Sequence, residues 1–275
     1  MDFSETELKQ HIEHKIHNAD IVHFPFPHLI IENFFPEDIY EHILSDNPFK
    51  YNTGKEWINK GRSEKLKTGT PYSARKQINF HANIQLNMDP DAIEFWNNLK
   101  KIFLNDNWFE KLVLSKYREY FIIRFGEIVN NDKFFSFFRK ELFLQQHDMG
   151  YFIGPHTDIP TRVFTCIFSF ADKPGYEEYG TEICVPKNPR IRCWGNNHYS
   201  PENFIIKKVA PYKPNNFLLF FKTRQSFHSV RLIDKDVPNK RYGMQFQLYE
   251  PPGGIFKDLS EPDLLVTKHN KEAVK

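Results

Sequence analysis

The chain has 275 residues, of which 40% are hydrophobic and 28 are phenylalanine. This composition supplies enough apolar side chains for one large core and excludes an intrinsically disordered protein. The 37 basic and 35 acidic residues leave a net charge of only +2, so the chain as a whole gives no electrostatic indication of nucleic-acid or anionic-membrane binding.

The sequence also lacks the usual marks of export. No apolar run reaches the roughly 18 residues of a membrane span, and the first residues carry acidic side chains without an apolar signal core. The three cysteines, Cys166, Cys184 and Cys193, contain no Cys-x-x-Cys pair and are expected to be free thiols. We therefore expect a cytoplasmic protein with no membrane partner.

Residues 1–138 are expected to form a mixed, mainly helical part. Ser4 and Glu7 make a capping box before apolar residues at helical spacing. Helices are expected from residue 4, over residues 36–44, from Asp89 onward and over residues 107–125, with a strand over residues 28–35. The apolar side of the helix after Asp89 consists of Ala92, Phe95, Trp96, Leu99, Ile102 and Phe103.

A basic segment interrupts these elements. Residues 51–76 contain seven Lys or Arg residues against two Glu residues. Such a segment is compatible with a flap that attracts an anionic substrate and equally with a solvated loop.

From residue 139 the pattern changes to short strands separated by turns. Strands are expected over residues 141–147, 162–170, 181–185, 204–209, 216–222, 227–232 and 242–249. Closely spaced short strands are typical of a sandwich or barrel. We expect a mainly β protein with N-terminal helices, in which residues 139–250 form a double-stranded β-helix (jelly roll, cupin-like) core. Residues 251–275 would be a C-terminal extension, and residues 1–275 one structural unit.

His156 and Asp158 are two residues apart in the run Gly154-Pro155-His156-Thr157-Asp158. On a strand, residues i and i+2 point to the same face, so both side chains can reach one metal ion. His228 lies in a later strand-like segment and can supply a third ligand. Two imidazoles and one carboxylate suit Fe(II) and leave about three coordination positions free.

Each residue of this set also has a simpler interpretation. His156 on its own is compatible with a turn histidine bonded to Asp158, and His228 with a histidine of the core. His198 is a less favoured third ligand, because its Gly- and Asn-rich surroundings are typical of a loop. The ordered set of His, Asp, His and a following arginine favours the metal site.

Arg241 opens the last predicted strand and is the candidate partner of an acidic co-substrate. An unpaired carboxylate in a mostly apolar barrel costs several kcal/mol. A guanidinium offers it two charge-assisted hydrogen bonds. Arg231 is the competing cation, but at an odd offset from His228 on the same strand it is expected to point the other way.

The ordered set resembles the 2-oxoglutarate and Fe(II)-dependent oxygenases, especially their prolyl-hydroxylase-like branch, over about residues 139–250. The matching pieces are Gly150–Asp158 (GYFIGPHTD), Arg162–Ser169 (RVFTCIFS), Gly180-Thr181-Glu182, His228-Ser229-Val230 and Lys240-Arg241-Tyr242. The resemblance implies that His156, Asp158 and His228 bind Fe(II), and that Arg241 binds the distal carboxylate of 2-oxoglutarate.

The resemblance also points to three further co-substrate contacts. Gln146 and Ser169 fall where this branch often has a tyrosine, and Thr165 would share the inward face of its strand with Ser169. The family activity, which consumes O2 and 2-oxoglutarate, releases succinate and CO2 and hydroxylates a small-molecule or peptide substrate, is the expected function. Halogenation is disfavoured, because Asp158 is intact and would occupy the position at the metal that a halide needs.

Two other classes remain compatible with the sequence. A cupin-like metalloenzyme would use the same metal without 2-oxoglutarate, and a non-catalytic jelly-roll protein would only bind. A Ser-His-Asp hydrolase is disfavoured, since the chain has no Gly-x-Ser-x-Gly elbow. The insertion 187–198, with Arg190, Arg192 and Trp194, is a candidate substrate-binding loop.

Overall fold

The structure is a computed structural model that describes residues 4–51, 74–80, 88–195 and 197–251. The expected C-terminal extension, from residue 252, and most of the basic segment, residues 52–73, lie outside the described residues. Its α-helices are α1 (Glu5–Asn18), α2 (Glu37–Ser45), α3 (Pro90–Leu104), α4 (Trp108–Lys116) and α5 (Arg118–Phe125). None of the described helices has the length and apolar character needed to cross a membrane.

The helix boundaries follow the capping residues that the sequence indicates. The side chain of Ser4 accepts a hydrogen bond from the backbone N–H of Glu7, and Asp89 caps α3 through the N–H of Asp91. The single helix predicted over residues 107–125 is wrong, because the chain breaks at Tyr117, with φ −107° and ψ 27°, into α4 and α5.

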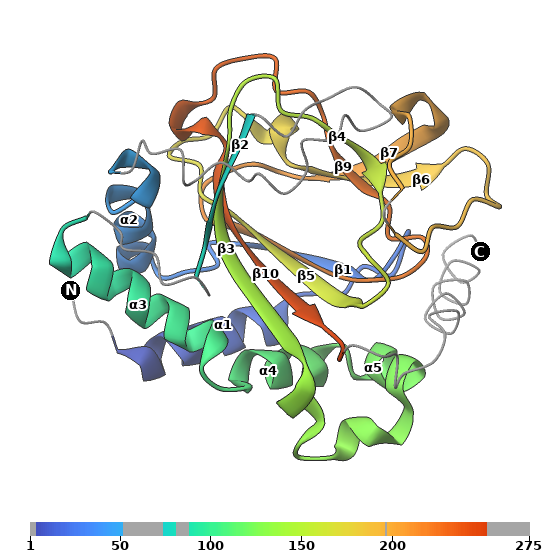
Figure 1. Ribbon diagram of the computed structural model, residues 1–275, viewed down its shortest axis with the longest axis horizontal. Helices are drawn as coiled ribbons and strands as arrows, with labels where there is room; N and C mark the ends of the chain where they lie inside the picture. Colours follow the sequence, from blue (N-terminus) through green and yellow to red (C-terminus); the bar gives the residue numbers. More distant parts are fainter. Residues whose placement is uncertain (1–3, 52–73, 81–87, 196, 252–275) are drawn as a thin grey trace.

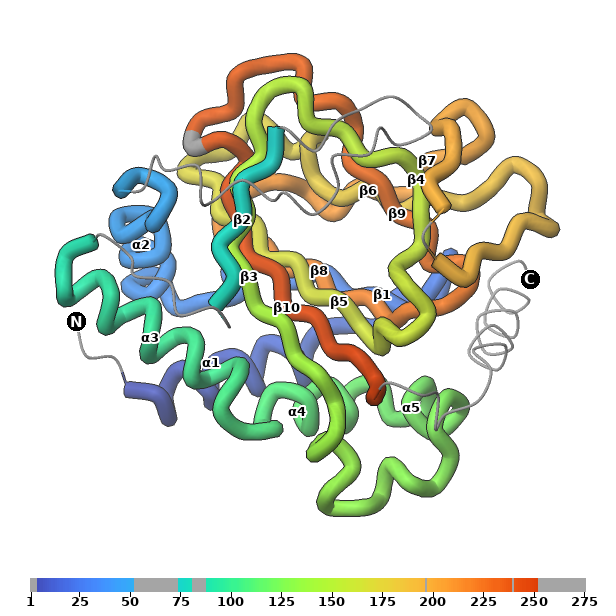
Figure 2. Tube along the Cα trace, viewed as in Figure 1, coloured from blue at the N-terminus to red at the C-terminus, as the bar shows by residue number. Residues whose placement is uncertain are grey.

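The strands form two antiparallel sheets that face each other, as the predicted double-stranded β-helix requires. The strands are β1 (His28–Glu32), β2 (Arg75–Asn79), β3 (Arg139–His147), β4 (Ile153–His156), β5 (Arg162–Ser169), β6 (Thr181–Pro186), β7 (Phe204–Ala210), β8 (Asn216–Phe221), β9 (His228–Val230) and β10 (Tyr242–Tyr249). The larger sheet has the order β1-β8-β5-β10-β3-β2, and the smaller has the order β4-β9-β6-β7. The two sheets and their connections are shown in Figures 1 and 2.

The helices cover one face of the larger sheet, and the smaller sheet lies on its other side (Figure 1). Alternate residues of the central strands, such as Leu142, Phe164 and Phe246, are fully buried in the core under the helices. Phe109 of α4 packs edge-on against Phe246, with ring centroids 5.2 Å apart. Because side chains alternate along a strand, the intervening residues face the space between the sheets.

Besides the helix predicted over residues 107–125, three strands differ from the sequence prediction. The first strand ends at Glu32, and not at residue 35, because Asn33 adopts a left-handed conformation with φ 51°. β2, at the end of the basic segment, was not predicted, and β4, which was expected to carry both His156 and Asp158, ends at His156.

Candidate metal centre

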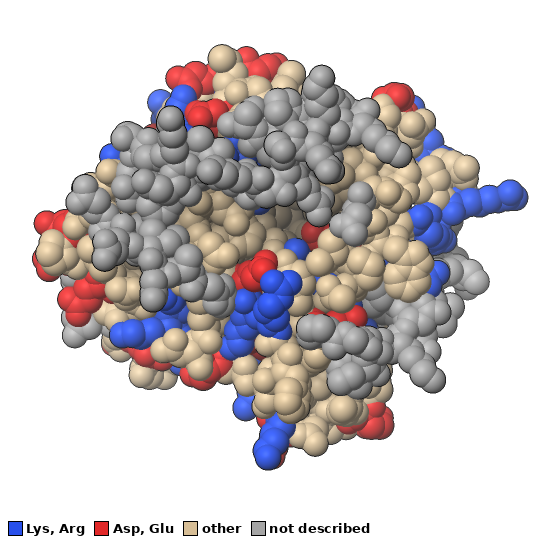
Figure 3. Space-filling view, in the orientation of Figure 1, with Lys and Arg blue, Asp and Glu red and all other residues tan. Residues whose placement is uncertain are grey.

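A cavity of about 330 Å³ lies between the two sheets. Figure 3 shows a hollow at the centre of this face, with charged side chains of both signs in and beside it. The wall of the cavity includes His156, Asp158, His228 and Arg241, so the four residues that the sequence singled out meet at one cavity.

His156 and His228 are brought together by strand pairing. His156 of β4 lies directly opposite His228 of β9, and their ring centroids are 4.2 Å apart. A bulge in β4 between Ile153 and His156 precedes this pair. Gly154 lies within the bulge, where a Cβ atom would come within 2.6 Å of the carbonyl oxygen of Tyr199. The close approach of Tyr199 to the bulge therefore depends on a residue without a side chain.

Asp158 reaches the site from a turn. The strand ends at His156, so the expectation that both residues of the His-x-Asp pair lie on one strand is wrong. The hydroxyl of Thr157, between the two, donates to the carbonyl of Cys193 at 3.0 Å and accepts from the fully buried Lys222 at 3.2 Å. These contacts fix the turn and direct Asp158 towards the two histidines.

The hydrogen bonds of the two imidazoles leave one nitrogen of each ring for a metal. Nδ1 of His156 donates to the carbonyl of Gly154 at 2.9 Å, and Nδ1 of His228 donates to the carbonyl of Ser226 at 3.0 Å. Nε2 of each ring is therefore the nitrogen that remains available to a metal. Burial lowers the pKa of His228. Burial and the neighbouring His228 together hold the pKa of His156 well below its usual value. Both rings are therefore neutral.

The carboxylate of Asp158 completes the set. Burial alone would raise its pKa, but the Arg162 guanidinium, helped by the hydrogen bond from Thr165, outweighs burial and holds that pKa well below its usual value. The ligand atoms of His156, Asp158 and His228 all lie within 4.8 Å of one another. Two neutral imidazoles and an ionised carboxylate at this spacing fit Fe(II) or a similar divalent metal.

Arg241 lies at the start of β10 in a left-handed conformation, with φ 33° and ψ 68°. Its Nε donates to the carbonyl of Tyr179 at 2.6 Å, and its Nη1 lies 3.0 Å from Nδ1 of His147. Neither contact uses Nη2, and the side chain lines the same cavity as His156, Asp158 and His228. Arg231, the competing cation, is exposed and does not line this cavity.

The three other expected co-substrate contacts have different positions. Thr165 lines the cavity and donates a 2.6 Å hydrogen bond to Oδ2 of Asp158. Ser169 lies beside Arg241 in a smaller adjoining hollow. Gln146 lines neither space, whereas its neighbours Gln145 and His147 do. Gln146 does not line the cavity because side chains alternate along β3, and the cavity face belongs to the odd-numbered residues.

The sequence missed several residues of the site. His147 was detectable, since it follows Gln146 and shares the face of Glu141, which lines the cavity. Arg162 was harder to find, because a bulge in β5 sets its direction. Arg75, at the end of the basic segment, also lines the cavity.

The residues of the insertion 187–198 that the sequence singled out for substrate binding lie outside the cavity wall. Arg190, Arg192 and Trp194 are exposed and do not line the cavity. The guanidinium of Arg224 lies 4.0 Å from the ring centroid of Trp194. His198 does line the cavity, with its ring stacked 4.6 Å from that of His156, but it is not part of the group of His156, Asp158 and His228 that could hold a metal.

No protein-family model and no curated protein sequence matches the chain. Among solved structures, it is similar to a prolyl-4-hydroxylase from Pseudomonas putida (8% identity, TM-score 0.46, covering 88% of this chain and 99% of that one). It is also similar to a full-length Neurospora crassa protein in complex with alpha-KG and 5-formyluracil (14%, 0.43, 94% and 89%). A third similar structure is HygX from Streptomyces hygroscopicus with nickel, 2-oxoglutarate and hygromycin B bound (10%, 0.40, 82% and 83%).

Proposed function

We propose that the protein is an Fe(II)- and 2-oxoglutarate-dependent dioxygenase that hydroxylates a small-molecule or peptide substrate. The observation that carries this proposal is the convergence of His156, Asp158 and His228 within 4.8 Å, in a cavity that Arg241 also lines. When bound, Fe(II) and 2-oxoglutarate supply the oxidising chemistry, with O2 consumed and succinate and CO2 released. The protein supplies binding, orientation and shelter from water.

Each of the three proposed ligand side chains has a part in holding the metal. The Nδ1 hydrogen bonds of His156 and His228 fix each ring and present Nε2 to the metal. Asp158 brings the negative charge that offsets part of the metal charge. Because three protein ligands leave about three positions free, a co-substrate bound through two atoms and O2 can be accommodated together.

Arg241 would bind the distal carboxylate of 2-oxoglutarate. Its guanidinium is held by Tyr179 and His147 on one side, which leaves Nη2 for the carboxylate. A guanidinium that is already oriented loses little conformational entropy when it binds. Hydrogen bonds to charged groups are worth about 1.5–3 kcal/mol each, which corresponds to about a 10- to 150-fold change in affinity.

The test is turnover of 2-oxoglutarate to succinate with Fe(II) and O2. His156→Ala and Asp158→Ala should abolish it, and Arg241→Ala should weaken apparent 2-oxoglutarate binding by about 10- to 150-fold. Arg231→Ala removes a nearby but exposed cation and is the matched control, with turnover unchanged.

The same assay separates the competing functions. A cupin-like enzyme without 2-oxoglutarate would bind the metal but form no succinate, whether or not Arg241 is replaced by Ala. Equal succinate formation by the wild type and the two ligand variants would contradict the proposal, and so would a purified protein that takes up no iron.

A further inference from the structure

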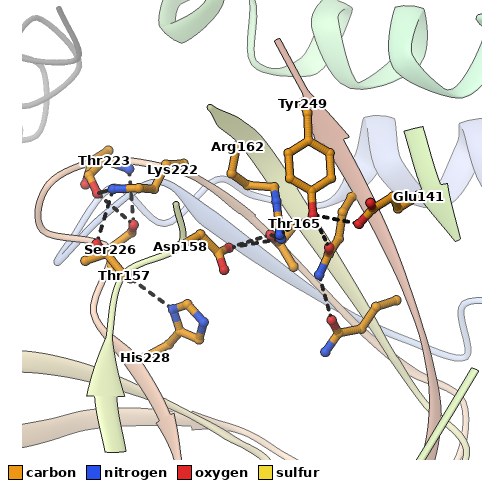
Figure 4. A network of polar contacts seen from close by, with 12 residues as sticks. Glu141, Thr157, Asp158, Arg162, Thr165, Lys222, Thr223, Ser226, His228 and Tyr249 are labelled. Carbon is orange, nitrogen blue, oxygen red and sulfur yellow. Dashed lines mark hydrogen bonds and ion pairs between the residues drawn. The ribbon is translucent and has the colours of Figure 1, made fainter. Parts of the chain in front are cut away.

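A chain of buried polar contacts holds one oxygen of the Asp158 carboxylate. The hydroxyl of Thr165 donates to Oδ2 at 2.6 Å, and Nη1 of Arg162 lies 3.5 Å from the same oxygen. The same Nη1 also donates to the hydroxyl of Thr165 at 3.0 Å. Both contacts fall on Oδ2, which leaves Oδ1 for the metal. Figure 4 shows Thr165 and Arg162 on one side of Asp158 and His228 on the other.

Arg162 is itself fixed by Tyr249. Its Nη2 donates to the Tyr249 hydroxyl at 2.6 Å, and its guanidinium lies 4.3 Å from the centroid of that ring. The Tyr249 hydroxyl in turn donates to Oε2 of Glu141 at 2.7 Å. The side chain of Arg162 is only 8% exposed, so its planar fork is held in a single orientation.

The strand is deformed in a way that makes this arrangement possible. Arg162 and Thr165 are three residues apart, and in a regular strand an odd offset places two side chains on opposite faces. Phe164 lies opposite Leu248, but Arg162 lies opposite Tyr249, so β5 contains one extra residue at Val163. This bulge turns Arg162 to the same face as Thr165, and both line the cavity.

We propose that Arg162, Thr165 and Tyr249 are positioning residues that make Asp158 bind its metal through one oxygen only. This inference rests on the metal centre of the proposed function, and it does not depend on the identity of the co-substrate or substrate. A carboxylate can bind a metal through one or two oxygens. Binding through both would occupy one of the positions that a co-substrate and O2 need.

The three residues are expected to act in series. Thr165 contacts Asp158 directly, Arg162 contacts both Thr165 and Asp158, and Tyr249 acts through Arg162. Removing the hydroxyl of Tyr249 should therefore weaken metal binding only while Arg162 is present. A lysine at position 162 keeps the charge but lacks the fork that reaches both Asp158 and Tyr249.

The experiment uses Co(II) as the probe metal, because its visible spectrum reports the number and geometry of its ligands. Thr165→Val, Arg162→Met, Arg162→Lys and Tyr249→Phe are compared in the full chain by Co(II) affinity, Co(II) spectrum and unfolding midpoint of the metal-free protein. Thr165→Val and Arg162→Met should weaken Co(II) binding by about 10- to 100-fold, the usual effect of losing a contact to a metal ligand, and should change the spectrum.

Arg162→Lys should recover part of the affinity that Arg162→Met loses. Tyr249→Phe should have a smaller effect, and no added effect in the Arg162→Met background. Tyr40→Phe is the matched control: it removes a buried tyrosine hydroxyl that bonds the Ala171 carbonyl, away from the cavity, and should leave affinity and spectrum unchanged.

The possible failures can be told apart. Wild-type Co(II) affinity and spectrum in both Thr165→Val and Arg162→Met would overturn the inference. A lowered unfolding midpoint with no change in the Co(II) spectrum would indicate a merely structural role and would also overturn it. A wild-type protein that binds no Co(II), or that binds it equally well after Asp158→Ala, would overturn the proposed metal centre, and the inference with it.

Discussion

Nη1 of Arg241 lies 3.0 Å from Nδ1 of His147, and both side chains are buried in the wall of the cavity. Burial, reinforced by the Arg241 guanidinium, holds the pKa of His147 well below its usual value. The imidazole is therefore neutral and accepts the hydrogen bond through Nδ1. His147 thus orients the guanidinium that we propose binds 2-oxoglutarate.

Replacing His147 should therefore weaken co-substrate binding without affecting the metal. His147→Leu removes one hydrogen bond to a charged group, so the dissociation constant for 2-oxoglutarate should rise about tenfold. Anaerobic calorimetric titration of the metal-loaded protein measures it. Unchanged 2-oxoglutarate affinity, with metal affinity also unchanged, would show that His147 does not orient Arg241.

The ion pair between Arg124 and Glu250 should be important for stability. Arg124 of α5 is fully buried, and its Nη2 lies 3.2 Å from Oε2 of Glu250 and 3.0 Å from the carbonyl of Pro160. Arg124→Met leaves an uncompensated buried carboxylate and should cost about 3–5 kcal/mol in the free energy of unfolding. Arg124→Met/Glu250→Gln should cost less than Arg124→Met alone. Urea denaturation checks both values, and equal losses would contradict this account.

Glu110 should make stability depend on pH. Its carboxylate is fully buried 2.8 Å from Nζ of Lys140, and burial, only partly offset by Lys140, raises its pKa to about 7. Because the pKa of Glu110 is higher in the folded chain than in the unfolded chain, the stability that this carboxyl contributes is fully present below the unfolded-state pKa of about 4.5. That contribution is lost as pH rises through about 7, and it amounts to at most about 3 kcal/mol.

Glu110→Gln cannot ionise and should lose this part of the pH dependence. The measurement is the free energy of unfolding of wild type and variant at pH 5 and pH 8. The free energy of unfolding of Glu110→Gln, relative to that of the wild type, should be higher at pH 8 than at pH 5. A difference that is the same at both pH values would show that Glu110 is ionised throughout.

Phe168 should be among the more costly core positions. Its ring is almost fully buried and lies 4.8 Å from Phe217 and 5.6 Å from Phe103, measured between centroids. Phe168→Ala should destabilise the protein by about 3–5 kcal/mol. Phe137→Ala, at a ring that is 74% exposed, is the control and should change stability by less than about 0.5 kcal/mol. Comparable losses at both positions would contradict the assignment of the core.

The sequence predicted those parts of the fold that depend on local patterns. The helical spacing after Ser4 and Asp89 and the strand over residues 242–249 reappear with nearly the same bounds. The sequence also singled out the two histidines and Asp158, because their residue types and order restrict the chemistry. The structure then brings them together through the pairing of β4 with β9.

The sequence could not predict features that arise from strand register. The bulge at Val163 reverses the face on which Arg162 lies, and it depends on pairing with β10, about 80 residues later in the chain. The bulge before His156 likewise depends on β9. Gln146 was chosen because the branch of oxygenases that the chain resembles often has a tyrosine at this position, although alternation along β3 favours His147.

The central claim is that three side chains distant in sequence bind one metal ion. The most direct measurement is anomalous diffraction at the iron edge from crystals grown anaerobically with Fe(II) and 2-oxoglutarate. We expect one strong peak within coordination distance of Nε2 of His156, Nε2 of His228 and one oxygen of Asp158, with 2-oxoglutarate reaching Arg241. An iron peak elsewhere, or no peak between these three residues, would contradict the account.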